Sequence, residues 1–208
     1  MHPTTIKVSA PAFTSCVTKL VPKNIIENYY NKFKEGIMVT EDKKGLAQTV
    51  TGLIKPDEVT FGLNRIIKDI ELGKNKMALN VARFWPDRVE FTSAAMPPVY
   101  HYKAQTGEVD ELLLEGLPLG SFKGETYTLA TMDSNIGDAF IFLSDGLPEV
   151  ENESGEMLGY KAVLECVKNN GNLSAEEIKQ SLFDLGSAWL DGLQNQDDIT
   201  IVVIKKEK

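Results

Sequence analysis

The order of apolar and polar residues predicts helices on both sides of a series of short strands. Apolar residues recur at helical spacing from Asn24 to about Gly52, and a clearer helix runs from Pro56 to about Gly73. Further helices are predicted over Tyr160 to Asn169 and from Ser174, where Ser174 and Glu177 form a capping box. The Pro56 helix has one apolar stripe, which consists of Val59, Leu63, Ile66, Ile67 and Ile70.

Between these helices the hydrophobic period changes to that of strands. Short runs separated by turn residues predict strands over Met77–Phe84, Arg88–Ser93, Val99–Lys103, Glu111–Leu114 and Glu125–Met132. Turn signals at Pro86-Asp87 and Thr106-Gly107 indicate hairpins, so we expect an antiparallel meander. The run Phe140–Leu143 has no polar break and predicts a strand buried on both faces, and Ile199–Ile204 predicts a last strand.

Acidic residues stand at one end of each of the last two predicted strands. Asp145 follows the Phe140 strand and precedes Gly146, which permits a tight turn. Asp197 and Asp198 lead into the Ile199 strand. A carboxylate at the edge of a core needs a partner, because a lone buried charge is unfavourable. The two acidic strand ends therefore suggest a shared cation site.

Composition and charge narrow the class of protein. A chain of 208 residues with 42% hydrophobic and 25% charged residues is typical of one globular domain with a substantial core. The net charge of -8 and the isoelectric point near 4.9 argue against nucleic acid and anionic membranes as partners. No apolar run reaches the roughly 20 residues of a membrane span, and the N-terminus lacks a signal-peptide pattern.

The two cysteines, Cys16 and Cys166, have no metal-binding or disulfide spacing, so we expect reduced thiols in a cytoplasmic protein. Residues 1 to 22 form a poorly defined N-terminal segment in this interpretation, and residues 23 to 208 form the domain.

Six stretches of the chain, in order and at similar spacing, resemble the phosphatase domain of the stage II sporulation protein E (SpoIIE) family of bacterial type 2C serine/threonine phosphatases. They are LNRIIKDIELGKNKMALNVARF (63–84), TSAAMPPVYHY (92–102), GLPLG (116–120), GDAFIFLSDGLPE (137–149), GEMLGY (155–160) and QNQDDITIVVIK (194–205).

This resemblance implies an α+β fold in which helices flank a sandwich of two antiparallel sheets. It implies a site at one edge of the sandwich, where carboxylates hold two Mn²⁺ or Mg²⁺ ions that activate a water. Carried over by position, Asp145 and Asp197 are metal ligands, Asp198 lies beside Asp197, and Gly146 lets the turn approach the ion. The resemblance implies no catalytic side chain beyond these. The usual substrate of the family is a phosphorylated anti-sigma-factor antagonist.

The sequence departs from the family pattern upstream of Gly36. The family has a Gly-Asp pair and a Gly-His-Gly turn there, whereas this chain has neither and contains no aspartate before Asp42. The domain is therefore expected to be N-terminally abbreviated. Three explanations stay open: a pseudophosphatase that acts as a binding module, substitute ligands such as Glu27 or Glu35, and a site completed by another chain in a homo-oligomer.

Other polar residues receive structural interpretations. His101 has no catalytic partner nearby in sequence and is predicted to be an exposed strand residue. The acidic residues Glu149, Glu151 and Glu153 are interpreted as a solvated loop, and residues 95 to 98 as a rigid turn between strands.

Overall fold

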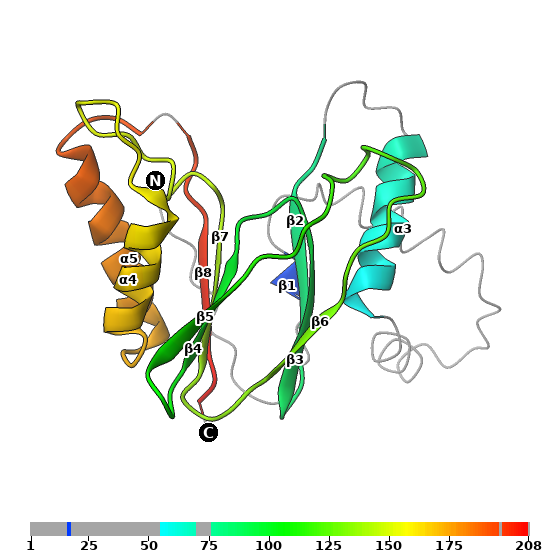
Figure 1. Cartoon of the computed structure of the whole chain (residues 1–208), viewed down its shortest axis with the longest axis horizontal. Helices are drawn as coiled ribbons and strands as arrows, with labels where there is room; N and C mark the ends of the chain where they lie inside the picture. Colours follow the sequence, from blue (N-terminus) through cyan, green and yellow to red (C-terminus); the bar gives the residue numbers. More distant parts are fainter. Residues whose placement is uncertain (1–15, 18–54, 70–75, 196, 208) are drawn as a thin grey trace, which may run out of the picture. The chain divides into compact units, whose positions relative to one another are not determined.

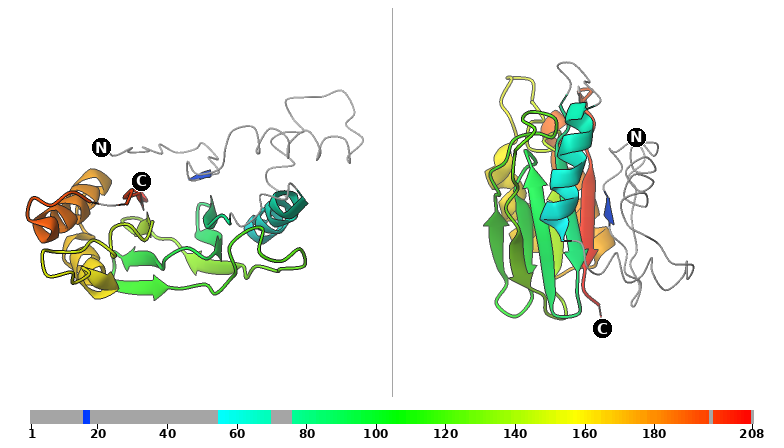
Figure 2. Two further views of the ribbon diagram at one scale, coloured as in Figure 1. Left: turned by 90° about the horizontal axis from the view of Figure 1, so that it is seen from above. Right: turned by 90° about the vertical axis from the view of Figure 1, so that its right-hand side faces the viewer.

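The computed structural model describes residues 16–17, 55–69, 76–195 and 197–207, which form two compact units (Figures 1 and 2). The first unit includes Phe13–Ala95 and Leu114–Met132, and the second includes Met96–Leu113 and Asp133–Lys208. The predicted helix over residues 24–52 lies outside the described residues. No helix of the described ranges is long and apolar enough to cross a bilayer.

The first unit contains a sheet with strand order β1-β2-β3-β6. Its strands are β1 (Cys16–Val17), β2 (Leu79–Phe84), β3 (Arg88–Ala94) and β6 (Ala130–Asp133). The apolar stripe of α3 (Pro56–Asp69) packs on this sheet, where Leu63 and Ile67 join Leu79 and Val81 in a buried cluster. Asn64 lies on the same helix face, and its side chain bonds the backbone of Gly120 and Phe122, each at 2.8 Å.

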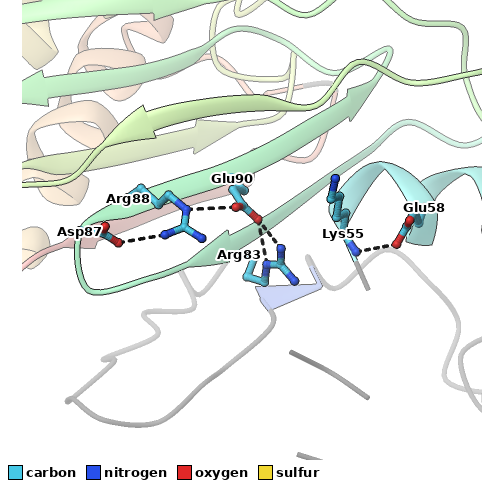
Figure 3. Close-up of polar contacts among 6 residues, drawn as sticks. All are labelled: Lys55, Glu58, Arg83, Asp87, Arg88 and Glu90. Carbon is cyan, nitrogen blue, oxygen red and sulfur yellow. Dashed lines mark hydrogen bonds and ion pairs between the residues drawn. The ribbon is translucent and has the colours of Figure 1, made fainter. Parts of the chain in front are cut away.

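The β2–β3 hairpin closes at Pro86-Asp87 as predicted, with the Trp85 N–H donating to the Arg88 carbonyl at 2.8 Å. Glu90 accepts hydrogen bonds from Arg83 and Arg88 (Figure 3). The guanidinium carbons of these two arginines lie 4.6 and 4.8 Å from the Trp85 ring centre. Burial raises the pKa of Glu90, but the hydrogen bonds from Arg83, Trp85 and Arg88 outweigh it and leave the pKa below its usual value. Polar contacts thus fix the closed end of this hairpin.

The second unit contains a sheet with strand order β5-β4-β7-β8, in which neighbouring strands are antiparallel. These strands are β4 (Val99–Lys103), β5 (Glu108–Leu112), β7 (Ala139–Leu143) and β8 (Ile201–Lys205). All five residues of β7 are buried, which confirms the prediction of a strand without a solvated face. Helices α4 (Gly159–Asn170) and α5 (Ala175–Leu190) pack on the sheet, and α5 begins with the predicted capping box.

The predicted meander is wrong in one respect: β3 and β4 do not pair with each other but belong to different sheets. Between them, Ala95 has a positive φ of 55°, and Pro97 and Pro98 lack the N–H groups that a continued ladder would need. The predicted strand at Glu111–Leu114 is shifted to Glu108–Leu112. The predicted strand at Glu125–Met132 is reduced to Ala130–Asp133.

The prediction of an exposed His101 is wrong, because only 3% of this residue is exposed. Its ring stacks on Phe140 at 4.3 Å, and its Nε2 lies 3.2 Å from the carboxylate of Asp138, which is also buried. Asp138 accepts two further hydrogen bonds, from the N–H groups of Ala104 at 2.9 Å and Asn135 at 2.8 Å. The pair therefore joins β4 to the turn that precedes β7.

Gly171, at the end of α4, touches the ring of Tyr102, and a Cβ built there would lie 2.2 Å from that ring. Its φ of -63° suits alanine, so Gly171→Ala tests packing alone. We expect the variant to lose about 1–3 kcal/mol of unfolding free energy in urea titrations, as other overpacked cores do. The neighbouring exposed variant Asn172→Ala is the control, and equal denaturation midpoints for the two would contradict the close contact.

Candidate metal site at the β7–β8 edge

The pairing of β7 with β8 continues beyond the strands and brings the two acidic strand ends to one edge of the sheet. Leu143 pairs with Ile201, and the next residue, Ser144, donates its N–H to the Thr200 carbonyl at 3.0 Å. In an antiparallel pair, the end of one strand lies beside the start of the other. Asp145 and Asp198 therefore belong to segments that meet at the same edge.

Gly146 makes the closest approach between these segments. A Cβ at this position would lie 2.4 Å from the carbonyl oxygen of Asp198, a distance that no side chain tolerates. The need for glycine here comes from this approach, because Gly146 is not among the glycines with a positive φ. The structure thus brings together Asp145, Gly146 and Asp198.

The three aspartates at this edge are all exposed. Oδ1 of Asp197 accepts a hydrogen bond from the Asp198 N–H at 2.7 Å, and the Asn195 side chain donates to the Asp197 carbonyl at 2.5 Å. Among the described residues, the Asp145 carboxylate forms no hydrogen bond or ion pair. Its oxygens are therefore available to a ligand.

Two residues that the sequence interpretation did not single out contribute to this edge. The Ser144 hydroxyl accepts from the Thr200 N–H at 2.9 Å and donates to the Asp198 carbonyl at 3.3 Å, so it ties the two segments together. Burial raises the pKa of the Tyr160 hydroxyl, and the negative charges of Glu149 and Asp145 raise it further. Ser144 could have been identified from the sequence only by its place between an apolar strand and an aspartate.

The donor set is suited to a hard divalent cation, because carboxylate oxygens are the ligands that Mg²⁺ and Mn²⁺ prefer. Within the described residues, however, no group of three or more His, Cys, Asp or Glu side chains could hold a metal ion. The aspartates of the β7–β8 edge thus fit part of a metal site and do not by themselves form a two-ion centre. Their role as ligands stays a prediction.

The model of the family described as "Stage II sporulation protein E (SpoIIE)" matches residues 36–207. Comparison with curated protein sequences gave no match.

Several solved structures have a similar fold. The SiaA-PP2C domain of Pseudomonas aeruginosa is 17% identical with a TM-score of 0.63, and the alignment covers 74% of this chain and 61% of that one. The phosphatase domain of SpoIIE from Bacillus subtilis, solved with a fragment of its regulatory domain, is 17% identical with a TM-score of 0.61, and the coverage is 88% and 48%. The catalytic domain of the phosphatase PstP, in complex with two manganese ions, is 15% identical with a TM-score of 0.55, and the coverage is 86% and 77%.

This chain spans less than two thirds of the length of the first two of these structures. The likeness in fold agrees with the two antiparallel sheets and the three helices of the described residues, as the predicted α+β class requires. Because the family model matches well over half of the sequence, the chain belongs to the stage II sporulation protein E family and has the type 2C phosphatase fold.

Proposed function

We propose that the chain is a metal-dependent protein serine/threonine phosphatase domain that removes phosphate from a phosphoprotein regulator, such as an anti-sigma-factor antagonist, in the cytoplasm. The observation that carries this proposal is the meeting of Asp145, Gly146 and Asp198 at the β7–β8 edge. Family membership supports the reaction class, and the manganese ions in PstP support the choice of metal.

In this proposal, Asp145 and Asp197 hold Mn²⁺ or Mg²⁺ through carboxylate oxygens, and Gly146 allows the turn to lie close to the ion. Ser144 keeps the two segments in register, and the Asn195 side chain fixes the backbone at Asp197. A bound ion would supply Lewis-acid chemistry and lower the pKa of a coordinated water. No side chain is assigned as general acid or base.

The test is Asp145→Asn, with Mn²⁺ binding followed by calorimetry and hydrolysis of a generic phosphomonoester followed in the same samples. The substitution removes a charged ligand, so we expect both affinity and Mn²⁺-dependent turnover to fall by at least about tenfold. Asp133→Asn, an exposed aspartate on β6, is the control and should leave both unchanged. Wild-type protein without metal-dependent turnover would reject the enzymatic function.

A second candidate function is a pseudophosphatase that binds a phosphorylated regulator without hydrolysing it. It is favoured by the scarcity of acidic residues upstream of Lys55, where the sequence offers Glu27, Glu35, Glu41 and Asp42 and no Gly-Asp or Gly-His-Gly. Binding of the regulator would then survive both Asp145→Asn and removal of divalent metal. A homo-oligomer in which a second copy completes the site would instead show turnover that depends on protein concentration.

A further inference from the structure

Among the large apolar side chains that are exposed between β7 and β8, one lies in the loop before α4, one in the first turn of α4 and one after α5. Met157 is 57% exposed, Leu193 is 42% exposed and Tyr160 is 37% exposed. The loop of residues 145–158, drawn in yellow, and residues 191–195 and 197–200, drawn in orange to red, lie at the same end of the second unit in Figure 1. Large apolar groups exposed near one another are typical of surfaces that bind another molecule.

Met157 is held outward by a hairpin rather than by a disordered loop. Glu151 and Met157 form an isolated antiparallel bridge, and the Asn152 N–H donates to the Glu156 carbonyl at 3.1 Å. That carbonyl also accepts a hydrogen bond from the Trp189 indole N–H of α5 at 2.9 Å. Because the Trp189 side chain of α5 anchors the hairpin by this hydrogen bond, the position of Met157 is largely set before any partner binds.

The charge near these apolar groups is mostly negative, and Lys161, which is exposed beside Tyr160, is the exception. The sequence contains no lysine or arginine between Lys123 and Lys161, and none between Lys179 and Lys205. Five exposed carboxylates lie in the loop and hairpin instead: Asp145, Glu149, Glu151, Glu153 and Glu156. Within the described part of the chain, none of these five forms an ion pair.

We propose that this apolar surface, formed by Met157, Tyr160 and Leu193 and surrounded by carboxylates, docks a basic segment of the phosphoprotein that also carries an apolar side chain. Unpaired charges of one sign steer a partner of the opposite sign and select its register. A partly exposed Met, Leu and Tyr supply the apolar contact that such a segment needs for affinity. The other occupant that the apolar groups alone would allow, an acidic segment, is disfavoured by like-charge repulsion.

The surface adjoins the candidate metal site. The loop that leads into the hairpin starts directly after Asp145, whose carbonyl accepts the Glu149 N–H at 3.0 Å. After burial and Glu149, the charge of Asp145 also contributes to the raised pKa of the Tyr160 hydroxyl. A segment bound on Met157 would therefore place a neighbouring phosphoserine near the β7–β8 edge. This inference extends the proposed function, because it takes the partner to be the phosphoprotein, but binding can be measured without turnover.

The experiment measures the affinity of fluorescently labelled phosphoserine peptides for the full chain. One peptide has lysines and a leucine beside the phosphoserine, a second has glutamates in place of the lysines, and a third has serine in place of the leucine. The protein variants are Met157→Ala and the double variant Glu151→Gln with Glu153→Gln. Leu113→Ala, which is 61% exposed, and Glu165→Gln on α4 are the matched controls.

We expect the lysine and leucine peptide to bind best, and Met157→Ala to weaken it more than about fivefold, as for an interface anchor. The double glutamine variant should weaken it several-fold at low ionic strength and less at high ionic strength. The controls should not change affinity. Equal binding of the glutamate peptide, or equal affinity of all variants, would overturn the inference.

Turnover of the small phosphomonoester separates this inference from the proposed function. The hairpin variants should leave that turnover unchanged, because Glu151, Glu153 and Met157 are not ligands of the proposed metal site. Absent turnover with the expected peptide discrimination would reject the phosphatase and retain the docking surface. Normal turnover without peptide discrimination would reject the docking surface alone.

Discussion

Replacing Gly146 by alanine is expected to weaken Mn²⁺ binding by about 10–100-fold, the usual effect of disturbing groups that position metal ligands. The added methyl group would lie 2.4 Å from the Asp198 carbonyl oxygen, so the turn at Asp145 and the segment at Asp198 must separate. Because the obstacle is backbone, a side-chain rotation cannot relieve it. The variant keeps all three aspartates, and calorimetric titration with Mn²⁺ therefore measures the effect of their placement alone.

The matched control is Gly155→Ala in the same loop. Gly155 has a φ of 74°, so alanine there is strained by roughly 1–2 kcal/mol, but no atom lies within 4 Å of the added methyl group. We expect Gly155→Ala to lower the denaturation midpoint and to leave Mn²⁺ affinity near that of the wild type. If both variants lost affinity equally, general loosening of the loop would explain the result, and the role of the close approach would be refuted.

Replacing Asp138 by asparagine is expected to lower the free energy of unfolding by about 1–3 kcal/mol, the usual cost of leaving a buried donor without its acceptor. Asp138 accepts hydrogen bonds from the N–H groups of Ala104 and Asn135 and lies 3.2 Å from His101 Nε2. An asparagine amide would turn an NH₂ group towards one of these donors. The measurement is urea denaturation near neutral pH.

The pH dependence of this loss follows from the pKa of Asp138. Burial raises that pKa, but the hydrogen bonds from Asn135, Ala104 and His101 outweigh burial and hold it below its ordinary value. A carboxyl group with a lowered pKa stabilises the fold above its unfolded pKa of about 3.9, and this contribution disappears as the pH falls through the folded pKa. The difference between wild type and Asp138→Asn should therefore be full above about pH 4 and shrink below it.

Asp133→Asn serves as the control for this titration, because Asp133 is exposed on β6. It should change the unfolding free energy by less than about 0.5 kcal/mol at every pH, as surface substitutions usually do. A difference for Asp138→Asn that grew towards acid pH would contradict the assigned hydrogen bonds.

The elements that could be predicted from sequence are those with a strong local signal. The unbroken apolar run of β7 identified a strand with no solvated face, and Ser174 with Glu177 identified the start of α5. The meeting of the acidic strand ends was also within reach, because antiparallel pairing of the last two strands requires it. Metal binding by these aspartates is still a prediction.

Contacts between residues that are distant in sequence could not be predicted as well. His101 lies in the run Val99–Lys103, where alternation assigns residues to two faces but cannot show that both faces are buried. The carboxylate that His101 meets, Asp138, is 37 residues away, and their contact depends on the pairing of β4 with β7. The separation of β3 from β4 likewise depends on the backbone at Ala95, where alanine gives no sequence signal for a positive φ.

The arginine-flanked tryptophan of the β2–β3 hairpin has a counterpart in the other unit. The chain has two tryptophans, and Trp85 belongs to the first unit, whereas Trp189 belongs to the second. Each unit thus carries one tryptophan. In a variant with phenylalanine at either position, the tryptophan emission would come from a single unit, so the melting of each unit could be recorded by selective excitation of tryptophan without an added dye.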